Sequence, residues 1–378
     1  YLTLAPEYGD AALLRTFVDV LHAAGIRIIW DFVPNHSGLG FAPFQHAVTY
    51  GDTSSYWDWY NFHPVDGLQA GDGRDYDAWF GFGSLPKLET SNPEVFDYLI
   101  GVATHWTRYG FDGIRVDVPN ELENRTTFFQ AFRAETKSIN PDVYLIGEIW
   151  HRDPSWVQGD QFDALMNYAL GQEAAMKFAR AEIGGSAAWH AMAQLYASYP
   201  EASTAMAFNI AASHDTDRLL TMVGGGELGS TPDATALARQ RLASAILYAI
   251  PGMPVTYYGD ECAMLGSNAG SIHRARRTMQ WDSCDPAMLT HYTQLAGLKH
   301  GLDALGSPVI REYQATGPLL SFLRGEPGAG EVLGAFNQSS SEQTVTLPAG
   351  SWTDAVAGGT FTGTATLPAY GWRYLVRQ

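Results

Sequence analysis

The chain has 378 residues, of which 46% are hydrophobic and 13% aromatic, and this composition excludes a disordered protein. Its formal net charge of −17 excludes nucleic acid as the main partner, because phosphate contacts require clustered Lys and Arg, and it argues against an anionic membrane surface. No apolar run approaches the roughly 20 residues of a membrane span, so we expect a soluble protein, either cytoplasmic or secreted.

Six short apolar segments predict β-strands. They are rich in Val, Ile, Tyr and Phe, and each ends in polar or acidic residues. Their apolarity is continuous rather than alternating, which is typical of strands buried on both faces of a parallel sheet. In chain order they are residues 26–32, 113–118, 143–148, 162–168, 207–215 and 254–261.

Helical patterns lie between most of these strands. Residues 10–24 carry an apolar stripe at helical spacing that Gly25 ends, and residues 92–109 begin with a capping Asn92 and Pro93. Residues 125–139 and 233–250 show similar patterns. Strands that alternate with helices predict right-handed crossovers, in either an open α/β sheet or a (β/α)8 barrel.

Two regions depart from this alternation. Residues 37–90 are rich in Trp, Tyr, Phe, Gly and Asp, which indicates a small domain inserted on a barrel loop. Residues beyond about 306 contain short alternating segments with Gly, Ser and Pro between them, which indicates an antiparallel β module. Cys262 and Cys284 are too few for a disulfide scaffold, and their spacing leaves open either one bridge across a loop or two free thiols.

Acidic residues gather at the ends of the predicted strands. They are Asp31, Asp117, Glu148, Asp215 and Glu261, and they are accompanied by Arg115, His36 and His214. In a barrel, the carboxyl ends of the strands converge on the face that holds the active site. Since buried strand ends are poor places for unused charge, the pattern predicts a catalytic site there.

A set of carboxylates of this kind indicates cleavage of glycosidic bonds. A retaining glycosidase uses a carboxylate nucleophile and a carboxylic acid about 5–5.5 Å apart, and a third acid can stabilise the positive charge of the transition state. Arg115 precedes Asp117 by two residues on one strand, so both side chains point to the same face and the arginine can keep the aspartate ionised.

Five short stretches carry a family resemblance. DFVPNH (31–36), LPKL (85–88), GIRVDVPNE (113–121), GEIW (147–150) and SHDT (213–216) resemble, in order, the signature stretches of the α-amylase family, glycoside hydrolase family 13. The resemblance runs to about residue 300. Together with GDQFDALMNY (159–168), these stretches are similar to the neopullulanase, cyclomaltodextrinase and maltogenic amylase branch. That branch implies hydrolysis of α-1,4 bonds in cyclodextrins, pullulan, maltooligosaccharides or starch, often with transglycosylation.

The resemblance implies a role for each matching residue. Asp117 is the nucleophile, Glu148 the general acid and then base, and Asp215 the stabiliser of the transition state. Arg115 orients Asp117, while His36 and His214 bind the sugar at subsite −1. Asn120, Glu121 and Trp150 line the acceptor side, with loop packing as the alternative.

Other polar residues near the motifs are expected to be structural. Asn35 is expected to brace its loop rather than bind metal, so we predict no metal site and no required cofactor, with calcium left open. Structural or rim positions are expected for Asp217, Arg218, Asp260 and Glu261.

The resemblance also implies the architecture. We expect a (β/α)8 TIM barrel over residues 1–36 and 91–305, an inserted domain B over 37–90 after the third strand, and a C-terminal antiparallel β-sandwich over 306–378. Only seven strands can be counted, with residues 1–4 as the tail of the second, so we expect the first strand–helix unit to lie outside this chain. Pro119, where the branch usually has Ala, and SIHRARRTMQW (271–281) depart from the branch near the acceptor subsites.

The expected partner is an α-glucan oligosaccharide or a cyclodextrin, and a homo-oligomer is left open. Two alternatives accompany this expectation. One is another specificity of the same family, such as α-glucosidase or plain α-amylase. The other is an inactive homologue that binds a sugar or a protein partner, which the presence of all three acids disfavours.

Overall fold

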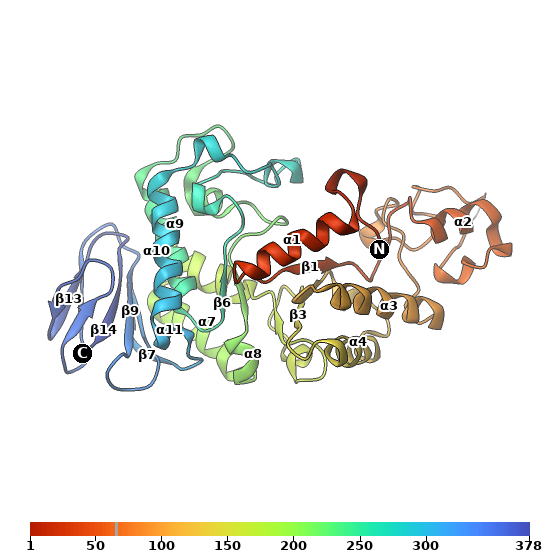
Figure 1. Ribbon diagram of the computed structural model, residues 1–378. Helices are drawn as coiled ribbons and strands as arrows, with labels where there is room; N and C mark the ends of the chain where they lie inside the picture. Colours follow the sequence, from red (N-terminus) through yellow and green to blue (C-terminus); the bar gives the residue numbers. More distant parts are fainter. Residues whose placement is uncertain (65–66) are drawn as a thin grey trace. The chain divides into compact units, whose positions relative to one another are not determined.

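The structure is a computed structural model that describes residues 1–64 and 67–378. The chain forms two compact units, which are coloured along the sequence in Figure 1. The first unit is Tyr1–Ile149 with Ser155–Leu165, and the second is Trp150–Pro154 with Met166–Gln378. Residues 65 and 66, within the predicted insertion 37–90, lie outside the described residues.

The first unit contains a four-stranded parallel sheet with the strand order β1-β2-β3-β4. Every residue of β2 and β3 is buried, which explains why their sequences are continuously apolar. The four predicted strands of this unit are thereby confirmed, although each is shorter than its apolar segment. Their bounds are β1 (Ile29–Phe32), β2 (Gly113–Val116), β3 (Tyr144–Gly147) and β4 (Ala164–Leu165).

The helices of the first unit are α1 (Ala11–Ala23), α2 (Ala42–Tyr50), α3 (Pro93–Tyr109) and α4 (Arg125–Ile139). Helix α3 begins and ends at the residues that its sequence predicts. The Asn92 side chain accepts a hydrogen bond from the Glu94 N–H at 2.9 Å, Pro93 takes the first helical position, and Gly110 ends the helix with φ of +113°. The chain then enters β2, which carries Arg115 at its third position.

Residues 1–4 differ from the prediction that they form the tail of a strand. A strand needs a ladder of backbone hydrogen bonds, and these residues form none within the described chain. Side chains hold them instead: the Tyr1 hydroxyl lies 3.0 Å from the Val33 carbonyl and 2.9 Å from that of His36, and the Trp106 indole N–H donates to the Tyr1 carbonyl at 2.8 Å.

The aromatic-rich region 37–90 is held by its own rings. Phe44, Tyr60 and Tyr76 are buried, and the Phe44 ring centroid lies 5.0 Å from that of Tyr60 and 5.1 Å from that of Tyr76. Such edge-to-face pairs stabilise a small core that contains little regular structure. The backbone of Ser37 donates to Pro86 at 2.9 Å, so the LPKL stretch lies beside the end of DFVPNH.

The second unit contains most of the remaining helices and a parallel pair of strands, β5 (Phe208–Ile210) and β6 (Met253–Val255). Helices α9 and α10 lie side by side (Figure 1). Across residues 1–64 and 67–378, no helix has both the length and the apolar character that crossing a membrane requires. The helices are α5 (Tyr168–Leu170), α6 (Lys177–Ala179), α7 (Gly185–Ser198), α8 (Glu201–Ala205), α9 (Ala234–Ala249), α10 (Pro286–Gly301) and α11 (Asp303–Gly306).

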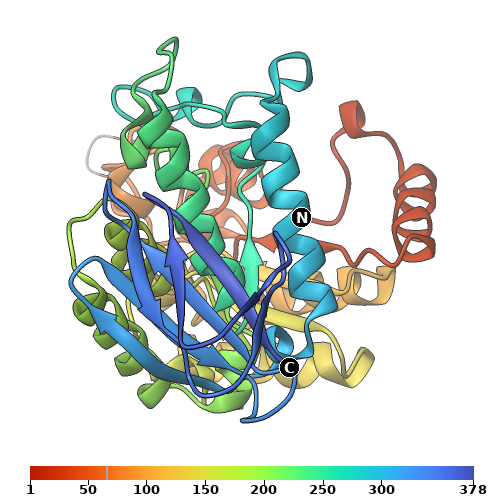
Figure 2. The same cartoon turned by 90° about the vertical axis from the view of Figure 1, so that its left-hand side faces the viewer.

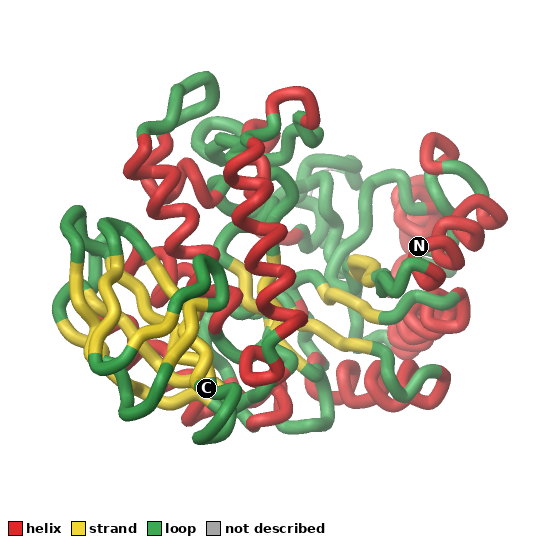
Figure 3. The backbone as a smooth tube through the Cα atoms, turned by 60° about the vertical axis from the view of Figure 1, so that its left-hand side comes forward, coloured by secondary structure: helices red, strands yellow, loops and turns green. Residues whose placement is uncertain are grey.

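The C-terminal part of the second unit is antiparallel, which confirms the predicted β module (Figures 2 and 3). Six strands form a sheet in the order β12-β11-β14-β9-β8-β7, and β10 pairs with β13. A separate apolar cluster combines residues of both sheets, including Leu333, Val345 and Leu367. The strands are β7 (Ile310–Thr316), β8 (Leu319–Arg324), β9 (Val332–Asn337), β10 (Gln343–Thr346), β11 (Trp352–Asp354), β12 (Thr360–Phe361), β13 (Thr364–Leu367) and β14 (Trp372–Arg377).

One hydrophobic core joins the helices of the second unit to its C-terminal sheet. Phe322, Phe336 and Tyr374 of the sheet belong to the same buried cluster as the apolar residues of α7, α9 and α10. The fully buried Arg324 donates to the carbonyls of Ala249, Leu305, Ser307 and Val309. The sheet and the helices are therefore linked by both apolar and polar contacts.

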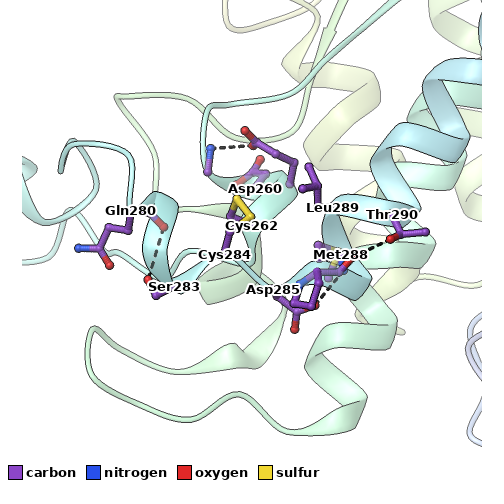
Figure 4. The surroundings of a disulfide bond; sticks show 12 residues. Asp260, Cys262, Gln280, Ser283, Cys284, Asp285, Met288, Leu289 and Thr290 are labelled. Carbon is purple, nitrogen blue, oxygen red and sulfur yellow. Dashed lines mark hydrogen bonds between the residues drawn. A yellow bond between two sulfur atoms is a disulfide. The ribbon is translucent and has the colours of Figure 1, made fainter.

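Cys262 and Cys284 form a disulfide bond, which resolves the alternative that the sequence left open (Figure 4). Cys262 ends a short 3-10 turn, Asp260–Cys262, and Cys284 precedes Asp285, which caps the first turn of α10. The bond therefore closes the irregular segment 263–283 against the start of a long helix.

Candidate active site

The guanidinium of Arg115 lies among three carboxylates in the first unit. Its Nη1 donates to Oδ1 of Asp31 at 2.8 Å and to Oδ1 of Asp117 at 3.0 Å, and its Nη2 lies 2.9 Å from Oε1 of Glu148. The parallel ladder explains this convergence. Asp31 is opposite Arg115 in the β1–β2 pair, while Asp117 and Glu148 directly follow β2 and β3. Two of the predicted catalytic acids therefore share one cation.

Burial strengthens these interactions. The side chain of Glu148 is 3% exposed, that of Arg115 is 10% exposed and that of Asp117 is 21% exposed. Burial alone lowers the pKa of Arg115, but the carboxylates around it raise that pKa further, so the net shift is upward. Three carboxylates therefore face one guanidinium, whose positive charge they stabilise.

The backbone directly after Asp117 is strained. Val118 follows Asp117 and has φ of +35° and ψ of +54°, a left-handed conformation that β-branched residues rarely adopt. Pro119 follows and disfavours the ordinary helical region for the residue before it. In this conformation the Val118 N–H donates to Oε2 of Glu148 at 3.1 Å, so the strained turn fixes the second oxygen of the buried glutamate.

His36 lies under an aromatic ring that the sequence did not single out. Its imidazole stacks on Trp79, with centroids 5.5 Å apart and planes at 24°, and its Nδ1 lies 3.2 Å from Nδ2 of Asn35. Burial lowers the pKa of His36 below its ordinary value, although nearby Asp117 raises it. A largely neutral ring can both donate and accept a hydrogen bond. Asn35 is buried, and its backbone carbonyl accepts a hydrogen bond from the Leu88 N–H; a bracing role for its side chain stays a prediction.

Asn120 and Glu121 lie on a short 3-10 turn after β2, Pro119–Glu121. The Asn120 amide donates to Oε1 of Glu121 at 2.8 Å. Both residues line an open surface hollow of about 620 Å³ that continues to Thr127. Their side chains are thus available on the surface of the first unit.

The third predicted acid, Asp215, belongs to the second unit, where both of its carboxylate oxygens have basic neighbours. Oδ2 lies 3.0 Å from Nε2 of His214, and Oδ1 accepts from Nη2 of Arg276 at 2.5 Å. The Asp215 N–H donates to Oγ of Ser213 at 3.1 Å. Sequence reasoning missed Arg276, because it lies in a segment without regular pattern, 61 residues from its partner.

Trp150 also belongs to the second unit, and it forms a parallel stack with Tyr168. The ring centroids are 4.0 Å apart and the planes differ by 2°. The Tyr168 hydroxyl lies 2.8 Å from Oγ of Ser213, which links the stack to the backbone of Asp215. Trp150 remains 41% exposed, so its ring is also available to a ligand.

The four residues expected to be structural take part in buried or backbone contacts. Oδ1 of Asp217 accepts from the Asn268 N–H at 2.6 Å, and Glu261 accepts from the Gly259 N–H at 2.7 Å. Arg218 is fully buried. Burial raises the pKa of Asp260 to about 7, against the effect of Arg218, and neighbouring Glu261 raises it further.

Within residues 1–64 and 67–378, no three His, Cys, Asp or Glu side chains are grouped as a metal site would require. The expectation that no metal or cofactor is required stays a prediction.

Carboxylates just beyond the ends of neighbouring parallel strands are an arrangement that suits a glycoside hydrolase, which needs a nucleophile and an acid close together. The chain belongs to the α-amylase family, since residues 1–297 match the family described as "Alpha amylase, catalytic domain".

Known proteins place the chain beside one branch of that family. It is 34% identical to a cyclomaltodextrinase from Geobacillus thermopakistaniensis (strain MAS1), over 98% of this chain and 63% of the relative. It is 35% identical to neopullulanase 2 from Thermoactinomyces vulgaris, over 92% of this chain and 57% of the relative. The solved structure of the type III pullulan hydrolase from Thermococcus kodakarensis matches with a TM-score of 0.95 and 45% identity, over all of this chain and 64% of that one. The chain thus spans less than two thirds of the length of these relatives.

Proposed function

We propose that this protein is a retaining glycoside hydrolase that cleaves α-1,4-glucosidic bonds of cyclodextrins, maltooligosaccharides, pullulan or starch. The observation that carries the proposal is the shared guanidinium of Arg115, which contacts Asp117 and Glu148 at the ends of neighbouring parallel strands. A nucleophile and an acid/base on adjacent strands can act on one bond from two sides.

In the first step, a carboxylate oxygen of Asp117 attacks the anomeric carbon of the sugar at subsite −1. The bond from that carbon to the glycosidic oxygen breaks, and Glu148 transfers its proton to the departing oxygen. The product is a covalent β-glucosyl ester, and its formation removes the negative charge of Asp117. The guanidinium of Arg115 then keeps Glu148 and Asp31 as its anionic partners, which favours an ionised Glu148.

In the second step, the ionised Glu148 takes a proton from water, and the water oxygen displaces Asp117 from the anomeric carbon. Two inversions give a product with the original α configuration. A sugar hydroxyl can replace the water, which yields transglycosylation. Asn120, Glu121 and Trp150 are proposed to bind that acceptor, and the exposure of Trp150 supports this role.

The remaining residues are proposed to stabilise the sugar at subsite −1. Asp215 binds its hydroxyls and stabilises the developing positive charge. His36 and His214 donate to other hydroxyls, and the lowered pKa of His36 suits a neutral donor.

Names of related proteins support the substrate class. They include cyclomaltodextrinases, neopullulanase 2 and a pullulan hydrolase, and one matching debranching-enzyme structure was soaked with acarbose. We propose the same class of α-glucan for this chain. We also propose that its parallel strands belong to a (β/α)8 barrel with the inserted domain 37–90 and a C-terminal domain 306–378.

The test is the release of reducing sugar from β-cyclodextrin, pullulan and soluble starch, with the anomer of the first product followed by NMR. Activity on cyclodextrin well above that on starch, with an α product, is expected. Activity confined to maltose or to short chain ends would instead favour an α-glucosidase, and a preference for starch a plain α-amylase. Tight sugar binding without turnover would indicate an inactive homologue and contradict the proposal.

A further inference from the structure

Arg276 is held against the Asp215 loop by two directed contacts. Its Nη2 donates to Oδ1 of Asp215 at 2.5 Å, and its Nε donates to the carbonyl of His214 at 2.8 Å. With His214 Nε2 3.0 Å from Oδ2, both oxygens of the carboxylate are oriented. Each carboxylate oxygen can accept more than one hydrogen bond, so acceptor capacity remains for sugar hydroxyls.

Two adjacent tyrosines fix the backbone on either side of Arg276. The hydroxyl of Tyr257 donates to the carbonyl of Ala275 at 3.1 Å, and the hydroxyl of Tyr258 donates to that of Arg277 at 2.7 Å. The buried guanidinium of Arg218 lies over both tyrosine rings, 4.6 and 4.8 Å from their centroids. Cation–π contacts with a buried guanidinium restrain these rings and hence their hydroxyls.

The start of segment 263–283 is packed, since Met264, Leu265 and Ser267 are buried and the Asn268 N–H donates to Asp217. Apart from the residues that Tyr257 and Tyr258 hold, the part over residues 269–283 is held less firmly. Its regular structure is limited to two short 3-10 turns, Ile272–Arg274 and the beginning of Trp281–Ser283. Ile272 is 46% exposed and Trp281 is 76% exposed, so large apolar side chains contribute little burial. Segments with few buried contacts open readily. The disulfide between Cys262 and Cys284 joins the two ends of this segment and limits such opening (Figure 4).

We infer that Arg276 is a positioning residue for Asp215, and that the Cys262–Cys284 bond maintains the segment that carries it. This inference rests on the proposed function, in which Asp215 stabilises the transition state. A dithiol can release the segment: the S–S bond breaks, each cysteine sulfur gains one hydrogen, and the dithiol is oxidised to its cyclic disulfide. Activity should then depend on the redox state of a bond outside the catalytic residues.

The first experiment compares three variants by kcat and KM on β-cyclodextrin or maltotriose. Arg276→Gln should lower kcat/KM by about tenfold to a hundredfold, mostly through kcat, because misplacing a catalytic group slows the chemical step. Arg276→Lys keeps the charge and should recover part of the loss. Arg274→Gln is the matched control, since it alters an exposed arginine of the same segment, and it should match the wild type. Wild-type rates in Arg276→Gln would overturn the positioning role.

The second experiment is a double-mutant cycle between Arg276→Gln and the pair Cys262→Ser with Cys284→Ser. Removing the disulfide should lower kcat several-fold in the wild-type background and have no further effect beside Arg276→Gln, because both changes act through one contact. Dithiothreitol should reproduce the loss in the wild type and leave the serine variant unchanged. Additive losses would overturn the link between the disulfide and Arg276.

A third measurement separates this inference from the proposed function. Trypsin cleaves after arginine, and the segment offers Arg274, Arg276 and Arg277. Reduction should raise cleavage at these sites, measured by mass spectrometry, without raising it at the exposed Arg152 elsewhere in the same unit. Unchanged cleavage would contradict the tether even in an active enzyme. Failure of the wild type to act on any α-glucan would overturn the proposed function, while the tether would still be decided by proteolysis.

Discussion

Nη2 of Arg115 and Oε1 of Glu148 lie 2.9 Å apart, while Nη1 of the same guanidinium donates to Asp117. A planar fork can serve both carboxylates at once, which an ammonium group cannot do with the same geometry. Arg115→Lys should therefore lower kcat/KM on maltotriose by about a hundredfold or more. Arg133→Lys is the control, because Arg133 pairs with Asp163 instead and should remain near wild-type activity. Equal rates in the two variants would contradict the role of the fork.

Asp117→Asn should lower turnover by about 10⁴-fold or more, as loss of a nucleophile does, without changing the unfolding midpoint greatly. The sharper test uses Asp117→Ala with α-maltosyl fluoride and azide. Azide enters from the face that the missing carboxylate occupied, so the expected product is a β-glycosyl azide. An α-glycosyl azide would show that Asp117 is not the nucleophile.

The loss of activity caused by Glu148→Gln should depend on the leaving group of the substrate. Maltooligosaccharides need a proton on the departing oxygen, whereas fluoride leaves without one, so the loss of activity should be much larger on maltotriose than on α-maltosyl fluoride. With azide, Glu148→Ala should give an α-glycosyl azide, the opposite anomer from the Asp117 variant. Equal losses on the two substrates would contradict the acid role.

His291 should make the protein less stable in mild acid. Burial, assisted by nearby Arg241, lowers the pKa of His291 from 6.5 to about 4. The unfolded chain therefore binds more protons than the folded chain between these values, and stability falls as the pH decreases from about 6.5 to about 4, by up to about 3 kcal/mol. His291→Gln should lose this pH dependence. Urea unfolding at pH 5 and 7.5 measures it, with exposed His273→Gln as control, and an unchanged slope in His291→Gln would contradict the assignment.

Asp260 should make the protein less stable as the pH rises, the opposite of the pH dependence expected from His291. Burial raises its pKa from 3.8 to about 7, so the folded chain binds more protons and stability falls as the pH rises through this range. Within the described residues, Oδ1 of Asp260 accepts no hydrogen bond. Asp260→Asn should therefore be more stable than the wild type at pH 8, by on the order of a few kcal/mol, and the advantage should shrink toward pH 4.5. A lower unfolding midpoint in the variant at pH 8 would contradict this prediction.

Apolar patterning and residue spacing predict much of the fold, because burial and side-chain direction are what stabilise these strands and helices. Strands β2 and β3 are buried on both faces, so their apolar runs are continuous, whereas β1 is partly exposed despite its apolar sequence. The spacing of Arg115 and Asp117 predicts their contact. Contacts that depend on irregular backbone could not be predicted. The left-handed Val118 and the reach of Arg276 to Asp215 arise from tertiary context, and no periodic pattern records them. Cysteine spacing likewise does not determine pairing.

Residues 1–4 show that sequence alone cannot predict a strand when its neighbouring strand is not known. Their sequence has strand character, but Tyr1 is fixed by the carbonyls of Val33 and His36 rather than by a backbone ladder. A strand is a property of two neighbours, so the segment alone could not specify it.

The shared core of the second unit limits how this chain can be shortened. The Tyr374 hydroxyl of β14 donates to the Ala245 carbonyl of α9, and a side chain at Gly185 would meet the Leu319 carbonyl of β8. Cutting the gene after α11 would leave an uncovered apolar helix surface and would yield aggregates rather than a minimal catalyst. Engineers who exchange C-terminal domains between relatives should therefore move the facing residues of α7 and α9 together with the sheet.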